Sequence, residues 1–190
     1  MLRSSLLVIA LFLAQPGQQL LTLEIRAFRG ADDVTHETRI TVHKAGERER
    51  AVAQVALGGS PLMNVPAGIY DAQAIHEKDR KVVSIRWAER LVVMPYPDEA
   101  GHHLEVINFT NGYGALQMRT AAGQKPEGEL ALFAASDHGR PVALARLHAM
   151  YALFVVPAST YDVQVKRAPK PAWHTGIDVP LDRTRLWIVP

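Results

Sequence analysis

Histidine is the residue type in this chain with the clearest potential for chemistry, because eight histidines occur among 190 residues and cysteine is absent. Imidazole nitrogens bind zinc or copper when several converge on one ion. His102 and His103 are adjacent, and neighbouring side chains of a strand point to opposite faces, so the pair cannot easily share a metal. His36 and His43 also differ in parity, and no HxxxH or HExxH spacing occurs. We therefore expect no metal site and no cofactor.

Catalytic signatures are equally sparse. Ser60 lies in a Gly-Gly-Ser-Pro turn and lacks the G-x-S-x-G elbow that exposes a nucleophilic serine. Asp98 and Glu99 are neighbouring carboxylates in a proline-flanked loop, where nothing in the sequence implies a pocket. No glycine-rich phosphate loop of the right spacing occurs. The sequence predicts no catalytic residues and no enzyme, and a metal-dependent enzyme is the less favoured alternative.

Two segments combine residue types that suit partner binding. Residues 166–174 read KRAPKPAWH, in which prolines stiffen the chain toward polyproline II and the cations precede an indole. Such a segment could dock an acidic protein or an anionic glycan through charge and stacking, or it could be a solvated connection whose tryptophan covers the end of a domain. The candidate contacts are Lys166, Arg167, Lys170, Trp173 and, in a second proline-rich segment, Tyr96. A lectin-like glycan binder would also use Trp87.

Composition limits the class of protein. The net charge is +2 with both signs interspersed, which does not favour nucleic-acid binding. The absence of cysteine excludes disulfides, thiolate metal sites and thiol catalysis. Hydrophobic residues make up 48% of the chain but aromatic residues only 7%, so a core must be built mainly from Val, Leu, Ile and Ala, of which the β-branched Val and Ile favour sheets.

The first 19 residues resemble a secretory signal. Arg3 precedes an apolar run from Leu6 to Ala14, and a polar Gln-Pro-Gly follows. Nine apolar residues are too few to cross a bilayer, which takes about 20. We expect residues 1–19 to be cleaved and the mature chain to be periplasmic or secreted, without a transmembrane segment. An uncleaved anchor or a buried first strand are the alternatives.

The remainder predicts short strands rather than helices. Leu23 and Ile25 alternate with polar residues, as do Ile40 and Val42, and no apolar stripe of helical period persists for three turns. Each such strand is expected to place one face on a core and the other in water. Turn clusters rich in Gly, Asn, Asp and Pro separate the strands, which indicates a sandwich or a barrel.

A ten-residue stretch occurs twice, as VPAGIYDAQA at residues 65–74 and VPASTYDVQV at residues 156–165. Pro66 and Gly68 suit the second and fourth positions of a reverse turn, so we expect the chain to reverse there. Tyr70 should then face inward, with its hydroxyl returning to the backbone as in the tyrosine corner of sandwich folds.

The same roles are expected in the second copy, where Ser159 replaces the turn glycine. Pro157 would form the corner, and Tyr161 would face inward. Asp71 and Asp162 would face outward, where they could brace the turn.

The repeat extends beyond these stretches. Residues 23–26 match residues 116–119, and Gly46 is matched with Gly139. Asn111-Gly112-Tyr113-Gly114 separates the copies. We therefore predict a signal at 1–19, one β-sandwich domain at 20–111 and a second at 112–190, with a linker so short that the pair is constrained.

The pattern of a strand, a glycine turn, a second strand and then V-P-A-G-x-Y-D-x-Q resembles the carboxypeptidase-regulatory-like or transthyretin-like β-sandwich modules found in tandem in exported bacterial proteins. This resemblance implies two seven-stranded sandwiches that bind or assemble without catalysis. The expected partner is a protein or a second copy of the chain, recognised through loops or sheet edges such as the terminal run Thr184–Val189. Glycan binding is the alternative.

Overall fold

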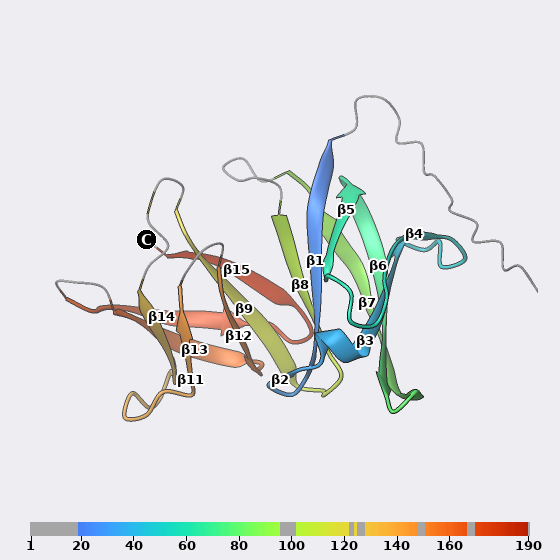
Figure 1. Cartoon of the computed structure of the whole chain (residues 1–190). Helices are drawn as coiled ribbons and strands as arrows, with labels where there is room; N and C mark the ends of the chain where they lie inside the picture. The colour runs from blue at the N-terminus through green and yellow to red at the C-terminus, as the bar shows by residue number, and fades with distance from the viewer. Residues whose placement is uncertain are drawn as a thin grey trace, which may run out of the picture.

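The computed structural model describes residues 19–95, 102–121, 124, 128–147, 151–166 and 170–189. Within these residues the regular structure consists of strands and one short 3-10 turn, η1 (Thr35–Glu37), as Figure 1 shows. The prediction of an all-β sandwich fold is confirmed. The predicted signal, apart from its last residue, lies outside the described residues. No helix in the described part is long and apolar enough to span a membrane.

Two sheets form the first half of the chain. In sheet A, β1 (Leu20–Arg29) pairs antiparallel with β2 (Asp32–Asp33) and β5 (Leu62–Pro66), and parallel with β8 (His102–Asn108). Sheet B has the order β4 (Ala51–Val55), β3 (Thr38–Lys44), β6 (Gly68–Lys78) and β7 (Lys81–Val93), with every pair antiparallel.

Two further sheets form the second half. In sheet C, β9 (Tyr113–Thr120) pairs antiparallel with β12 (Ala152–Pro157) and parallel with β15 (Thr184–Val189). Sheet D has the order β11 (Ala143–Arg146), β10 (Glu129–Ala134), β13 (Ser159–Lys166) and β14 (Ala172–Val179). Apart from β2, each strand of the first half has a counterpart in the second with the same partners and directions, including the single parallel pair.

The strand register shows which residues correspond. Leu23 and Leu116 occupy equivalent positions in β1 and β9. In the next pair of strands His43 lies opposite Asp71 and Phe133 lies opposite Asp162, so β3 and β10 align 90 residues apart. The predicted match of Gly46 with Gly139, which needs a spacing of 93, is therefore wrong, because the second copy is shortened before β10 rather than after it.

Each half encloses its own apolar core between its two sheets. Alternate residues of β1 point into the first core, where they meet the inner faces of β3, β6 and β7. In the second half β9 and β12 supply one wall, and β10 and β13 supply the other. The buried side chains are mainly Leu, Val, Ile and Ala, as the scarcity of aromatic residues predicts. The division into domains at residue 111 stays a prediction.

The two halves pack against one another through the outer faces of sheets A and C. A small apolar cluster forms there from Phe28, Val106 and Ala115, with Leu153 and Val155 packed beside it. Only four residues connect β8 to β9. The outer face of β1, which strand alternation predicts to be in water, is consequently covered by the second half.

Candidate functional site

The repeated stretches form equivalent corners. Pro66 ends β5 in sheet A and Gly68 begins β6 in sheet B, so the chain crosses between sheets here instead of reversing within one. The Tyr70 hydroxyl donates to the carbonyl oxygen of Pro66 at 2.6 Å, and the Tyr161 hydroxyl donates to that of Pro157 at 2.7 Å. Burial raises the pKa of both tyrosines. The corner is a structural element.

The aspartate after each corner tyrosine is buried, with 4% of its surface exposed in both copies, and does not face solvent as expected. The reason is a β-bulge opposite each aspartate. Asp71 accepts hydrogen bonds from the backbone N–H groups of Arg90 and Gly46, and Asp162 accepts one from Gly176. These bonds hold the pKa of both aspartates below the usual value. Asp71 therefore ties the bulge of β7 to the turn after β3, and Asp162 braces the bulged part of β14.

A tryptophan and a cationic or titratable side chain lie beside each aspartate on the outer sheet face. In the first half the Arg48 guanidinium lies 4.2 Å from the ring centroid of Trp87. Arg48 also forms an ion pair with Glu89 and lies 3.9 Å from a carboxylate oxygen of Asp71. A cation over an indole face is attracted by the ring quadrupole, so Arg48 is held from three directions.

The second half places an imidazole where the first half has a guanidinium. The ring of His138 stacks on Trp173 with centroids 4.5 Å apart, and its Nε2 lies 2.6 Å from Asp162. Phe133 packs on the same indole at 5.0 Å. Trp173 is nevertheless 41% exposed. Trp173 is thus the residue of the predicted basic segment whose exposed surface is available to stack against a ligand.

The predicted partner contacts are only partly brought together. Lys166 ends β13, and Lys170 lies two residues before β14, the strand that contains Trp173. Both lysines are exposed. Arg167 and Tyr96 lie outside the described residues. His138, which lies in a segment separate from the other histidines in the sequence, is the residue that joins Trp173 to Asp162. Its equivalence to Arg48 is visible only once the strand register is known.

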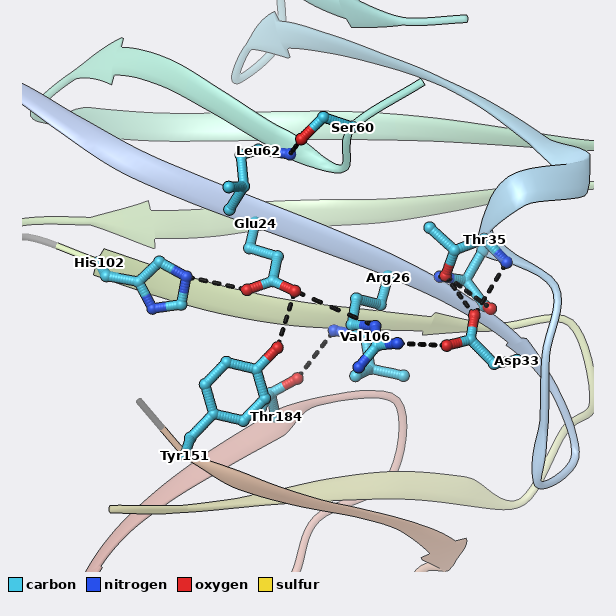
Figure 2. A network of polar contacts seen from close by, with 11 residues as sticks. Glu24, Arg26, Asp33, Thr35, Ser60, Leu62, His102, Val106, Tyr151 and Thr184 are labelled. Carbon is cyan, nitrogen blue, oxygen red and sulfur yellow. Dashed lines mark hydrogen bonds and ion pairs between the residues drawn. The ribbon is translucent and has the colours of Figure 1, made fainter. Parts of the chain in front are cut away.

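A buried polar network crosses the boundary between the halves (Figure 2). Glu24 of β1 accepts a hydrogen bond from the Tyr151 hydroxyl at 2.7 Å and one from His102 Nε2 at 2.9 Å. On the other side of the imidazole, Arg119 donates to His102 Nδ1 at 2.9 Å. Burial alone would raise the pKa of Glu24, but these hydrogen bonds outweigh it and lower the pKa. Since the donors come from both halves, the network fixes the halves together.

The turn between β14 and β15 also contacts the first half, at the edges of β7 and β8. Arg183 donates to the backbone carbonyl of Glu89 at 2.8 Å, and Thr184 Oγ1 accepts from the backbone N–H of Val106 at 2.8 Å. Arg86 bridges to Asn111 at 2.8 Å and to Asp182 at 2.6 Å. Edge backbone groups in this region are therefore satisfied by side chains of the second half.

A cleft of about 370 Å³ remains between these segments, lined by residues 86–89, 106–108 and 181–183. Glu105 lies next to it in β8. Burial raises the pKa of Glu105 to about 7, although hydrogen bonds from Thr184 and the charge of Arg183 act in the opposite direction. Both arginines at the cleft already have partners within the protein, so the cleft offers few unused donors.

The other end of β7 is an open edge. In the sheet order β4-β3-β6-β7, residues 81–85 follow β6 on one side, with a β-bulge at Val83, and pair with no described strand on the other. Val82, Val83 and Ile85 are 56%, 51% and 56% exposed. The turn before them has positive φ at both Asp79 and Arg80, which is the geometry of a tight type I′ hairpin.

This open edge has no counterpart among the described strands of the second half. Leu91 pairs with Tyr70, and Ile177 pairs with Tyr161, so β14 begins at the position equivalent to Arg86. The β6–β7 hairpin therefore extends five residues of β7 beyond the repeated unit, and in Figure 1 it projects past the neighbouring strands. We define Lys81–Ile85 as the open edge of β7.

No group of three His, Cys, Asp or Glu side chains that could hold a metal ion occurs within the described residues. The histidine side chains whose contacts the structure describes lie against carboxylates, carbonyls or aromatic rings. His102 and His103, for example, face opposite ways, and His103 Nε2 lies 2.6 Å from the carbonyl oxygen of Met94.

Comparison with known proteins gives only distant likenesses. No protein family and no curated protein matches the chain. Among solved structures, the Bacillus anthracis TIE protein matches 90% of this chain at 14% identity, with a TM-score of 0.35. The chain spans 33% of the length of that protein. Two Bacteroides ovatus ATCC 8483 proteins, described as a "putative adhesin" and a "putative cell adhesion protein", match at 11% and 10% identity.

The two Bacteroides proteins have TM-scores of 0.30 and 0.32, with 90% of this chain covered in both and 90% and 92% of theirs. At such scores the likeness carries no inference about the fold or partner of this chain.

Proposed function

We propose that the chain is an exported, noncatalytic binding module that recognises a protein partner through the open edge of β7. The proposal includes cleavage of residues 1–19, a periplasmic or secreted location, and two sandwich domains, 20–111 and 112–190, of the transthyretin-like or carboxypeptidase-regulatory-like kind. The repetition of seven strands and of the tyrosine corner supports the domain assignment.

The observation that carries the proposal is the contrast within one strand. Near Glu89 the backbone edge of β7 is closed by Arg183, and Arg86 is tied to Asp182. At Lys81–Ile85 the edge is open, apolar and longer than the repeated fold requires. Soluble proteins normally protect strand edges with charges, bulges or covering segments, because unpaired backbone groups recruit other strands. A single bulge at Val83 interrupts Lys81–Ile85, but no described segment covers it. An apolar edge left open suits strand addition by a partner.

The experiment is a selection of displayed random peptides on the immobilised chain, followed by affinity measurements of the selected peptides. The test variant carries Val83→Gln and Ile85→Gln, which remove apolar surface from the open edge. A matched variant carries Val142→Gln and Leu144→Gln, two exposed apolar residues at the edge of sheet D. All positions are exposed, so both variants should unfold at the wild-type temperature.

We expect the selected peptides to bind the β7 variant at least tenfold more weakly and the sheet D variant as tightly as the wild type, because each apolar side chain removed from the interface costs about 1 kcal/mol. Equal affinity for the wild type and the β7 variant would reject the open edge as the binding site.

Glycan binding is a second candidate, favoured by the exposure of Trp173. An indole that is stacked on one side by His138 can offer its remaining surface to a sugar ring. Binding to a glycan array that is lost with Trp173→Ala and kept with Trp87→Ala would support this candidate. Unchanged array binding in the Trp173→Ala variant would exclude the Trp173 surface.

A further inference from the structure

The charges beside the open edge of β7 limit which partner segments can bind there. The hairpin turn beside the edge contains Lys78, Arg80 and Lys81, with Asp79 as the single acidic residue of residues 78–81. Lys78 and Lys81 are directly opposite each other in the register and exposed. Glu77 is paired with Arg39 and does not neutralise the turn. The end of the edge is therefore basic.

We infer that the partner segment is an extended acidic strand: apolar or β-branched residues at alternate positions, with Asp or Glu at the end that lies beside the β6–β7 turn. The inference rests on the proposed binding at the β7 edge and names the chemistry of the partner. Backbone pairing along Lys81–Ile85 supplies the attachment, and the alternate apolar side chains cover Val83 and Ile85. Acidic residues at the turn end meet Lys78 and Lys81.

Charge also argues against a second copy of the chain as the occupant. Two β7 strands related by a two-fold axis would pair antiparallel, and only residues 81–85 are open, so the axis would pass near Val83. That register places the turn residue Arg80 of one copy beside the Arg86–Asp182 ion pair of the other, which offers it no unpaired carboxylate. The basic turns thus favour a different, acidic chain.

The opposite end of the edge limits the length of the added strand. Beyond Ile85, Arg86 is bound to Asp182 of the second half, and the cleft wall begins. At most five residues of partner backbone can therefore pair, and the bulge at Val83 interrupts even this short ladder. Recognition of a segment this short depends strongly on its flanking charges, so the acidic end should dominate specificity.

The test uses three fluorescently labelled peptides that share a Val-Thr-Val-Thr-Val centre and end on both sides in two Asp, two Gln or two Lys residues. Fluorescence anisotropy would measure their affinity for the full chain. We expect the Asp peptide to bind about tenfold more tightly than the Gln peptide, since two to three exposed ion pairs form, and the Lys peptide to bind most weakly. In 1 M NaCl the difference should largely disappear, because the screening length falls to about 3 Å.

A charge-reversed variant, Lys78→Glu with Lys81→Glu, provides the internal control. It should prefer the Lys peptide over the Asp peptide while binding the Gln peptide unchanged. The Val83→Gln, Ile85→Gln variant should weaken all three peptides.

The outcomes separate the two proposals. Equal binding of the three peptides, with loss in the Val83→Gln, Ile85→Gln variant, would overturn the acidic partner and leave the β7 edge as the site. Binding that this variant does not alter would overturn both. No binding of any peptide at millimolar concentration would overturn the acidic-strand inference, while the peptide selection would decide on the edge independently.

Discussion

Replacing each corner tyrosine with phenylalanine tests how the repeated stretches stabilise the fold. Tyr70→Phe and Tyr161→Phe each remove one hydroxyl and one hydrogen bond to a proline carbonyl, at 2.6 and 2.7 Å in the two copies, and keep the buried ring. The two substitutions are chemically identical. Their surroundings differ, because Pro66 is half-buried whereas Pro157 is exposed.

The difference in exposure predicts a difference in cost. A net intramolecular hydrogen bond contributes about 1 kcal/mol, and a buried acceptor left unpaired costs roughly 1 to 3 kcal/mol. Water can replace the missing donor at Pro157 but reaches Pro66 less easily. We therefore expect Tyr70→Phe to lower the free energy of unfolding by about 1.5 to 2 kcal/mol, and Tyr161→Phe by about 0.5 to 1 kcal/mol.

Urea unfolding followed by tryptophan fluorescence measures both values, since Trp87 reports on the first half and Trp173 with Trp187 on the second. Single-tryptophan backgrounds would separate the halves if they unfold in two steps. Costs below about 0.3 kcal/mol for both variants would refute the stabilising role of the corner. A larger cost for Tyr161→Phe than for Tyr70→Phe would refute the argument from solvent exposure.

Three further substitutions test other features. The pKa of Glu105 is raised to about 7, so its contribution to stability is full below the unfolded value near 4.5 and is lost as pH rises through 7. The free energy of unfolding of Glu105→Gln, measured in urea, should therefore rise relative to that of the wild type by roughly 1 to 3 kcal/mol between pH 5 and pH 8. A difference between the two proteins that does not change with pH would contradict this. Asp71→Ala leaves two backbone N–H groups without an acceptor and should cost about 2 to 4 kcal/mol at pH 7. Because the pKa of Asp71 is lowered, the charge-dependent part of its contribution is lost as pH falls through the folded pKa, so the cost should be smaller in acid than at pH 7, and an equal cost at both would argue against a role of the charge. Gly114→Ala places a Cβ atom on the carbonyl of Pro180 and should displace the β14–β15 turn, with a cost above about 2 kcal/mol that calorimetry would measure.

The sequence predicts the strands and the corners because these depend on neighbouring residues. Alternation of Leu23 and Ile25 with polar residues identifies a strand with one buried face whatever the rest of the chain does. Tyr70 reaches a carbonyl only four residues away. The burial of Asp71 escapes this reasoning because it depends on a bulge in β7, and alternation applied to β6 alone assigns that side chain to solvent.

Interactions between segments that are distant in the sequence cannot be predicted from it either, because they too depend on residues that are not neighbours in the chain. Glu24 alternates with core residues and should face water, yet it accepts hydrogen bonds from residues 78 and 127 positions away. No residue near Glu24 in the sequence indicates that the second half of the chain covers the outer face of β1. The basic segment does identify Trp173 as an exposed aromatic residue. The contact of Trp173 with His138 can be inferred only from the register of β10 with β13.

The comparison of the two copies also explains why the open edge of β7 is the best candidate for a function. Positions that the two copies share, such as the corner tyrosines and the buried aspartates, serve the fold that both must form. Lys81–Ile85 extends beyond the shared unit, contributes no residue to either apolar core, and keeps three large apolar side chains exposed. Such an extension adds an edge that can pair with other strands and so raises the risk of aggregation, which stability alone gives no reason to retain. The proposed binding of a partner strand would supply that reason, and the basic turn at the end of the edge would then select which strands bind.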